Sequence, residues 1–443
     1  MTRDELKAAA TAGEIDTVLL ALADMQGRLQ GKRMTARHFL DTVVGHGAEA
    51  CNYLLAVDVD MNTVDGYEMS SWQHGYGDFE MTPDLDTLAR VPWQDGTAVC
   101  LADIVWADGK PVVASPRQIL RAQLDRLAER GWAAFAGTEL EFIVFEDSYE
   151  QAWDGGYRNL TPSNRYNVDY SLLGTARVEP LLRRIRNAMM DAGMTVEDSK
   201  GECNFGQHEI NFLYDTALKT ADQHVVYKNG AKEMAAQDGK AITFMAKYDE
   251  REGNSCHIHL SLRGADGATV FADDDQLFDR FLAGMLAGLR ELTLFLAPNV
   301  NSYKRYAAQS FAPTTVAWGN DNRTCALRVV GHGAGKRIEC RVPGADVNPY
   351  LALSALIAAG LHGVDDQLDL EPALEGNAYT ATDRPQVPST LAEAADLFGA
   401  SRLARDAFGR EVITHYLNNA RVELDAFNAA VTDWERFRGF ERL

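Results

Sequence analysis

The apolar segment AFAGTELEFIVF, residues 134–145, carries two glutamates, Glu139 and Glu141, and it constrains the fold more than any other feature of the sequence. The segment predicts a buried β-strand, in which successive side chains point to opposite faces of the sheet. Glu139 and Glu141 therefore project from the same face. Two neighbouring carboxylates repel each other, and burying them is costly unless cations are present. Either this is the solvated face of an edge strand, or the sheet holds a pair of divalent metal ions.

Two further segments supply side chains of the metal-binding type. Glu202 and Glu209 lie on either side of a glycine-containing turn, and His257 and His259 alternate within the apolar segment CHIHLSL, residues 256–262. A single histidine is more often a structural residue than a ligand. Two histidines on one face of an apolar strand instead favour a functional site.

The segment RIECR, residues 337–341, places Arg337, Glu339 and Arg341 on one face of a third strand. One interpretation is a ladder of surface salt bridges. The other is a cationic wall that binds phosphate and carboxylate groups, with Glu339 holding a metal ion. Five glutamates and one histidine then form the ligand set, and such hard oxygen ligands favour Mg²⁺ or Mn²⁺ over a structural zinc. Further cationic clusters occur at 303–305 and 322–328.

The composition excludes several classes of protein and partner. The chain has 443 residues with 46% hydrophobic, typical of a globular protein, and a net charge of −21, which repels nucleic acid and anionic membranes. The six cysteines form no CxxC pair and are expected to be reduced thiols of a cytoplasmic protein. The N-terminus does not resemble a signal peptide. The longest apolar stretch, residues 350–361, is shorter than the ~20 residues of a membrane span and predicts a buried helix.

The order of apolar and turn segments predicts an α+β protein with two domains that divide at Asp108-Gly109. Residues 1–107 are expected to form a small α+β domain, and residues 108–443 a larger catalytic α/β domain. Three kinds of element are expected. The expected strands are 16–23, 98–106, 134–145, one near 195, 241–247, 256–262 and two within 322–342. The expected helices are 116–130, 180–192, 275–296, 350–361 and most of the last 60 residues. A long functional loop is expected to span 61–83.

The segment GHGAGKR, residues 331–337, looks like a phosphate-binding loop. It lacks the G-x₄-G-K-[ST] spacing and the hydroxyl residue, and a strand rather than a helix is expected after it. We therefore reject a P-loop.

Seven segments, in this order, resemble the glutamine synthetase family. They are GTELEF at 137–142, Glu202 with GQHEI at 206–210, TFMAK at 243–247, HIHLSL at 257–262, AP at 297–298 with NSYKR at 301–305, WG at 318–319 with NR at 322–323, and RIECR at 337–341 with NPY at 348–350. The resemblance covers nearly the whole chain. It implies a small N-terminal β-grasp-like domain, a catalytic domain of the glutamine synthetase type, and a homo-oligomeric ring, usually a dodecamer of two hexameric rings, with active sites between subunits.

The resemblance also implies a role for each matching residue. Glu141, Glu202 and Glu209 are expected to hold the metal ion near glutamate, and Glu139, His257 and Glu339 the metal ion on the ATP phosphates. Arg305 is expected to bind the carboxylate of the substrate, helped by Arg341 and the backbone at Gly253, and Arg323 to face the transferring phosphoryl group. Glu197, His259, Ser261, Arg328 and Arg337 are expected to line the nucleotide site.

The implied reaction uses ATP and two or more Mg²⁺ or Mn²⁺ ions per site. Metal ions and arginines neutralise the γ-phosphate of ATP while it moves to the side-chain carboxylate of glutamate. The resulting γ-glutamyl phosphate is an activated acyl group. An amine then displaces phosphate and forms an amide.

Three departures from the family pattern concern the amine. Phe311, in QSFAP at 309–313, stands where ammonia-using enzymes carry a glutamate that binds and deprotonates ammonium. An aromatic ring instead packs on an organic amine or contacts its cation. The family's N-terminal aspartate corresponds best to Asp58, with Asp60 as the alternative, and Glu252 replaces a substrate-binding asparagine. This pattern resembles the amine-using branch, the γ-glutamylpolyamine and γ-glutamylethanolamide synthetases of actinobacteria.

Three functions remain open from the sequence. The favoured one is an ATP-dependent ligase that joins glutamate to a primary organic amine such as ethanolamine or a polyamine. A glutamine synthetase that uses ammonia is the second, and a catalytically inactive ring scaffold is the third. Tyr379 falls near a tyrosine that some bacterial members adenylylate, but one tyrosine in a turn is weak support, so we predict no such modification.

Overall fold

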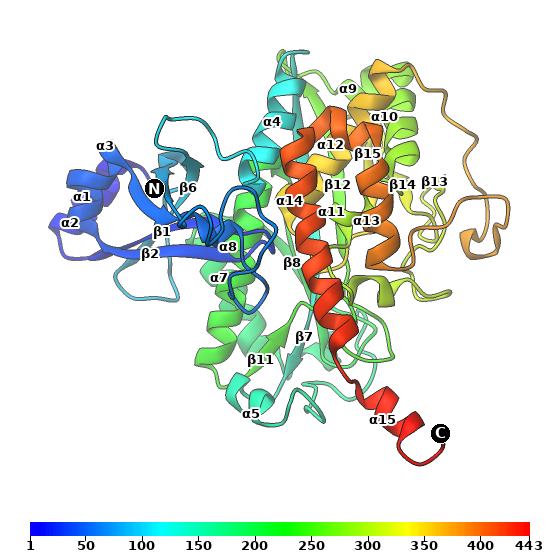
Figure 1. Cartoon of the computed structure of the whole chain (residues 1–443), viewed down its shortest axis with the longest axis horizontal. Coiled ribbons are helices and arrows are strands. Elements are labelled where there is room, and N and C mark those ends of the chain that lie inside the picture. The colour runs from blue at the N-terminus through cyan, green and yellow to red at the C-terminus, as the bar shows by residue number, and fades with distance from the viewer.

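The computed structural model describes residues 1–443, which form two β-sheets. The first sheet contains six strands and lies at one side of the molecule (Figure 1). Its order is β2-β1-β6-β4-β3, with β5 beside β6; β1 and β6 are parallel and the other pairs antiparallel. The strands are β1 (Thr17–Ala23), β2 (Leu29–Thr35), β3 (Ala48–Cys51), β4 (Asp78–Pro83), β5 (Ala89–Arg90) and β6 (Thr97–Val105), and the short helices of this part are α1 (Arg3–Thr11), α2 (Ala36–His38) and α3 (Val44–His46).

The second sheet has nine strands and carries the segments singled out from the sequence. Its order is β13-β14-β15-β12-β7-β9-β8, and the short strands β10 and β11 also pair with β7. Every pair is antiparallel except β13 with β14. The strands are β7 (Trp132–Phe145), β8 (Val196–Gly201), β9 (Gln207–Phe212), β10 (Asp215–Thr216), β11 (Ala241–Thr243), β12 (Cys256–Gly264), β13 (Trp318–Asn320), β14 (Leu327–Val330) and β15 (Arg337–Cys340).

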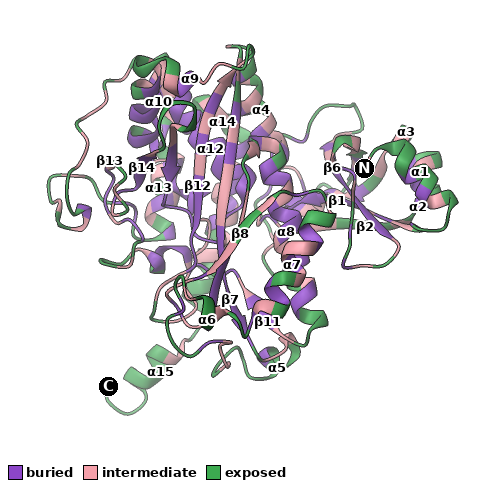
Figure 2. Cartoon of the chain, turned by 180° about the vertical axis from the view of Figure 1, so that it is seen from behind, coloured by how far each residue is buried: buried purple, intermediate pink, exposed green.

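Helices cover one face of the large sheet and leave the other face open. In Figure 2 the long strands β7 and β12 stand in front of α12, whereas in Figure 1 the helices are in front. The covering helices include α4 (Pro116–Ala128), α8 (Ala217–Gln237), α10 (Asp275–Gly288) and α12 (Pro349–Asp365). The others are α5 (Tyr149–Asp154), α6 (Leu172–Thr175), α7 (Glu179–Asp191), α9 (Val270–Asp273), α11 (Thr293–Leu296), α13 (Leu391–Ala400), α14 (Arg402–Ala429) and α15 (Asp433–Gly439). No helix of the chain combines the length and the apolar character that crossing a membrane requires.

The two sheets share one hydrophobic core, because a single cluster of 99 buried residues extends from Leu6 to Ala420. A buried ion-pair network joins the same two parts. Arg117 of α4 donates to Asp222 of α8 at 2.9 Å and 2.8 Å, and to Asp103 of β6 at 2.6 Å. Charges buried this deeply are stable only when they are paired. The network therefore fixes the small sheet against the large one. The division at residue 107 stays a prediction.

Most expected elements are present, and three expectations are wrong. The expected loop 61–83 ends in strand β4, which begins at Asp78. The expected strand 241–247 stops at Thr243, because the side-chain amide of Asn301 bonds both backbone groups of Lys247. The expected helix 275–296 is broken into α10 and α11. At the break, the hydroxyl of Thr293 donates a hydrogen bond to the carbonyl of Leu289 at 2.7 Å. Such a side-chain bond is a local alternative to the helical backbone hydrogen bond.

Candidate active site

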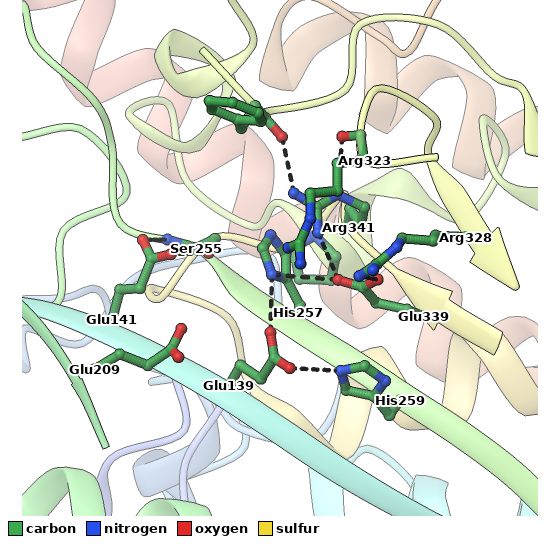
Figure 3. Close-up of polar contacts among 12 residues, drawn as sticks. Glu139, Glu141, Glu209, Ser255, His257, His259, Arg323, Arg328, Glu339 and Arg341 are labelled. Atoms are coloured by element: carbon green, nitrogen blue, oxygen red, sulfur yellow. Dashed lines mark hydrogen bonds and ion pairs between the residues drawn. The ribbon is translucent and has the colours of Figure 1, made fainter. Parts of the chain in front are cut away.

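A cavity of about 1060 Å³ lies on the open face of the large sheet. Only 7 of its 34 lining residues are hydrophobic, so the cavity suits charged rather than apolar ligands. Strands β7 and β9 carry carboxylates, β12 carries the histidines, β14 carries an arginine, and β15 carries an arginine and Glu339 (Figure 3). Glu202 lies in the turn between β8 and β9. The sheet thus gathers side chains from segments that lie far apart in the sequence.

Glu139, His257 and Glu339 form the first group of potential metal ligands. Antiparallel pairing sets Glu139 opposite His257 and places Glu339 on the next strand. Glu139 Oε2 lies 3.1 Å from His257 Nδ1, and Glu339 Oε1 lies 3.5 Å from the same nitrogen (Figure 3). One ligand atom from each residue falls within 4.8 Å of the others, as two carboxylates and an imidazole around one divalent ion require.

The surroundings keep this first group in the form that binds a metal. Burial by itself would raise the pKa of Glu139, but hydrogen bonds from His257 and His259 outweigh it and hold that pKa far below its usual range. Burial and the nearby Arg341 guanidinium lower the pKa of His257 to about 4. The imidazole is therefore neutral at pH 7, which leaves a lone pair for a metal ion.

Arginines surround the buried carboxylate of Glu339. Arg341 Nη1 donates to its Oε1 at 2.5 Å, and Arg328 Nη1 donates to its Oε2 at 2.8 Å (Figure 3). Arg337 Nε donates to His259 Nδ1 at 3.1 Å, and the other nitrogen of that ring lies 2.7 Å from Glu139. Fixed cations beside a metal-ligand group are the arrangement that phosphate groups require.

Glu141, Glu202 and Glu209 form the second group, and their electrostatics are opposite to those of the first. Burial, with repulsion among the carboxylates, raises the pKa of Glu141 to about 7 and those of Glu202 and Glu209 to about 8. Ligand atoms from the three side chains also lie within 4.8 Å of one another. Only Lys200, which bonds to Glu202, supplies a cation directly. A divalent ion supplies the missing positive charge, so the donor set fits Mg²⁺ or Mn²⁺.

Backbone and side-chain donors orient Glu141 within this group. The amide and the hydroxyl of Ser255 donate to its two oxygens at 2.7 Å and 2.6 Å (Figure 3). Gln207 Nε2 donates to Oε2 of Glu141 at 3.0 Å. On the neighbouring strand, Asn211 Nδ2 donates to Glu209 at 2.8 Å. These hydrogen bonds thus fix the orientations of the Glu141 and Glu209 carboxylates before any ion binds.

Arg305 and Gly253 meet at one wall of the cavity. Nη2 of Arg305 donates to the carbonyls of Arg341 and Pro343 at 3.0 Å and 2.9 Å, whereas its Nε is buried without a partner. A Cβ at Gly253 would lie 2.2 Å from the carbonyl of Ala246 and 2.8 Å from Cγ of Arg305, so only glycine fits there. Arg305 lines the cavity, so it places a guanidinium charge at this wall where an anionic ligand can bind.

Phe311, Glu252 and Arg323 also line the cavity, as the sequence led us to expect. Phe311 is 57% exposed and has a left-handed backbone, with φ of 57°. The carbonyl of Arg323 accepts a hydrogen bond from Arg341 Nε at 3.1 Å (Figure 3). The cavity thus has a cationic side and an aromatic rim.

Five residues named from the sequence lie outside the lining of this cavity. One is Glu339, whose buried carboxylate is bonded to Arg328 and Arg341 of the lining. Asp58 and Asp60 are in the loop before β4, where Asp58 accepts the amide of Asn62 at 2.8 Å and lies close to Glu423. Glu197 lines a different groove beside α7, and it lies at an irregularity in the pairing of β8 between Val196 and Asp198. Its neighbour Asp198 lines both this groove and the cavity. Ser261 follows the two histidines on the same face of β12 but lies farther along the strand.

Several residues that line the cavity were not predicted from the sequence: Asp169, Tyr170, Lys200, Gln207, Asn211 and Ser255. Gln207 and Asn211 could have been predicted, because each lies two positions from Glu209 in a strand and therefore shares its face. Asp169 and Tyr170 belong to an irregular segment before α6, where no periodicity places a side chain.

Comparison with known proteins gives a consistent result. The family described as "Glutamine synthetase, catalytic domain" matches residues 113–438. The chain is 66% identical over 443 residues to γ-glutamylethanolamide synthetase GlnA4 of Streptomyces coelicolor, covering 99% of this chain and 96% of that one. It is 38% identical to glutamate–isopropylamine ligase of a Pseudomonas species, covering 96% and 95%. A solved structure of GmaS in complex with ADP has a TM-score of 0.86 at 28% identity, covering 98% of this chain and 99% of that one.

Proposed function

This chain belongs to the glutamine synthetase family, and we propose that it joins the γ-carboxylate of L-glutamate to a primary organic amine with ATP. The observation that carries the proposal is one site that combines two groups of ligands, the first of them surrounded by arginines, with an aromatic rim at Phe311. A phosphoryl donor needs the first surroundings, and an organic acceptor suits the second. Small amines, ethanolamine first among them, are supported by the relatives named for ethanolamide and isopropylamine.

Each group of residues has a task in this reaction. Glu139, His257 and Glu339 would hold a metal ion on the ATP phosphates, and Glu141, Glu202 and Glu209 one near glutamate. Bound there, Mg²⁺ or Mn²⁺ supplies the charge neutralisation that phosphoryl transfer needs. Arg328, Arg337 and His259 would bind the nucleotide, and Arg337 and His259 are hydrogen-bonded to each other. Arg323 and Arg341 lie nearer the rim.

Arg305 has the geometry of a carboxylate-binding residue. Its Nη2 is fixed by backbone carbonyls, and the residue lines the cavity. Glutamate bound through its α-carboxylate at Arg305 would present its side chain toward Glu141 and the arginines. The γ-carboxylate oxygen attacks the γ-phosphorus of ATP, and ADP leaves. The amine nitrogen then attacks the acyl carbon, loses a proton, and phosphate leaves as the amide forms.

Phe311 supports an organic amine over ammonium. A phenyl ring accepts no proton and forms no ion pair, but it covers an alkyl group and contacts an ammonium through its face. The amine proton still needs a base. Glu252 lines the cavity, and Asp58 lies outside the cavity of its own chain, so we propose that Asp58 acts from a neighbouring subunit of a ring.

An amine panel tests the reaction. Phosphate release and product mass should be measured with glutamate, ATP and Mg²⁺ or Mn²⁺ against ethanolamine, isopropylamine, a polyamine and ammonium. We expect a primary organic amine to give the highest kcat/KM. Faster synthesis of glutamine than of any substituted amide would establish the ammonia-using alternative, and no turnover with any amine would favour an inactive scaffold.

Subunit mixing tests the ring. If Glu339 and Asp58 act in one site from two subunits, mixed rings of Glu339→Gln and Asp58→Asn contain some sites with both native residues, so they should be more active than the average of the two variants. Native mass spectrometry should give a ring, of twelve subunits by analogy with the family. If confirmed mixed rings regain no activity, Asp58 does not act in the active site of a neighbouring subunit. The cell compartment is proposed to be the cytoplasm, supported by six cysteines of which none forms a disulfide.

A further inference from the structure

The loop that carries Phe311 has an unusual backbone. Gln309 and Phe311 both adopt left-handed conformations, with φ of 64° and 57°. Residues with a Cβ seldom adopt this conformation, because the Cβ approaches the following carbonyl oxygen. Two such residues within three positions persist only when surrounding contacts hold them.

Two side chains from outside the loop donate to its backbone. Arg341 Nη2 reaches the carbonyl of Phe311 at 3.4 Å, which is long for a hydrogen bond (Figure 3). The hydroxyl of Tyr379 reaches the next carbonyl, that of Ala312, at 2.9 Å. The hydroxyl of Ser310 itself donates to the carbonyl of Ala307 at 2.6 Å and reaches that of Arg305 at 3.4 Å. The Tyr379 bond is therefore the stronger of the two external contacts.

Tyr379 sits on a segment that is itself fixed. It belongs to a short 3₁₀ turn, Ala378–Thr380, whose first residue is fully buried. The amide of Ala378 donates to Thr324 Oγ1 at 2.9 Å, and the hydroxyl of Thr315 donates to the carbonyl of Ala378 at 2.9 Å. The Tyr379 ring is half-buried, and burial raises the pKa of its hydroxyl, so it stays a donor at neutral pH.

We propose that Tyr379 is a positioning residue for the acceptor amine: its hydroxyl holds the backbone at Ala312 and thereby sets how Phe311 faces the cavity. This inference rests on the proposed function. The residues proposed for phosphoryl transfer and for glutamate binding have supports of their own, since Arg341 is bonded to Glu339 and Arg305 to backbone carbonyls. Loss of the Tyr379 hydroxyl should therefore affect the amine step and spare the formation of γ-glutamyl phosphate.

Tyr379→Phe removes the hydroxyl and keeps the ring. A neutral hydrogen bond of this kind corresponds to about a two- to tenfold effect, so kcat/KM for the organic amine should fall by that factor. KM for glutamate and for ATP should stay within about twofold, and so should the single-turnover rate of ADP formation without amine. Tyr149→Phe is the matched control, because Tyr149 donates to the carbonyl of Ile242 at 3.0 Å away from the cavity.

A double-mutant cycle with Phe311→Ala separates positioning from general stability. If Tyr379 acts through Phe311, its substitution should change kcat/KM for the amine little once Phe311 is already alanine. Additive effects, an unchanged amine kcat/KM in Tyr379→Phe, or equal losses for all three substrates would each overturn the inference. Absence of amide formation by the wild-type protein with every amine would overturn the proposed function first, and this inference with it.

Discussion

The second carboxylate group should make the metal-free protein less stable as pH rises, and Glu209→Gln should remove much of that effect. The pKa of Glu209 is raised to about 8 in the folded chain, against an ordinary 4.5, by burial and by Glu139 and Glu202. The folded state therefore binds more protons than the unfolded state between pH 4.5 and 8. Its stability falls as pH rises through this window, and the loss is complete above it.

The magnitude follows from the size of the shift. A carboxyl whose pKa moves from 4.5 to about 8 destabilises the folded state at pH 8 by roughly 4 kcal/mol as an upper figure, since neighbouring carboxylates share the effect. Glutamine carries no charge and still accepts the hydrogen bond from Asn211. For a chain of 443 residues, 1 kcal/mol corresponds to about 1 °C in Tm. Glu209→Gln should therefore raise the metal-free Tm by up to about 4 °C at pH 8 and hardly at pH 5.

Calorimetry in excess chelator, repeated with Mn²⁺ or Mg²⁺, provides the assay. Metal should raise the Tm of wild type more at pH 8 than at pH 5.5, and should raise the Tm of Glu209→Gln less than that of wild type at both. Glu129→Gln, an exposed carboxylate at the end of α4, is the control and should match wild type. A metal-free wild type as stable as Glu209→Gln at pH 8, or a metal effect independent of pH, would refute the reasoning.

Four further outcomes are expected. Glu141→Gln and Glu339→Gln should each abolish turnover in the amine assay while native mass spectrometry shows unchanged assembly, and full wild-type activity in excess chelator would contradict the metal assignment. Phe311→Glu should shift kcat/KM toward ammonium, by up to two orders of magnitude relative to an organic amine, because it restores an ion-pair partner; an unchanged ratio would remove Phe311 from the amine site. Asp58→Asn should lower kcat with every amine tested, whereas a loss confined to one amine would indicate a role in selectivity. Intact-mass measurement of protein from its native host should show no AMP on Tyr379, whose half-buried hydroxyl is already bonded to Ala312.

The local sequence determined which side chains share a face. Alternation along a strand is set by the backbone alone, so Glu139 with Glu141, and Arg337 with Glu339 and Arg341, could be grouped before any fold was known. Seven segments in a fixed order then identified the family, which the match over residues 113–438 confirmed. Helices with proline at their first turn were also predicted well, since Pro116, Pro180 and Pro349 mark the starts of α4, α7 and α12.

The same local rules missed one long helix, α8, that buries polar as well as apolar side chains. Helix α8 was not predicted, because it buries polar residues such as Asp222 and His224 as well as apolar ones and so lacks a single apolar stripe. The buried carboxylate of Asp222 is stabilised by an ion pair with Arg117, which lies 105 residues earlier in the chain. Amphipathic periodicity reports burial against one neighbouring layer, not against several.

Only the tertiary structure decided the charge and the partners of each site residue. Glu139 and Glu209 are the same residue type on neighbouring strands, yet the histidines of β12 lower the pKa of the first while burial among carboxylates raises that of the second. Likewise, the bond from Tyr379 to Ala312 joins positions 67 residues apart. Strand register and loop packing bring these groups within hydrogen-bonding distance, and electrostatic energies depend on distance and burial in space rather than on separation along the chain.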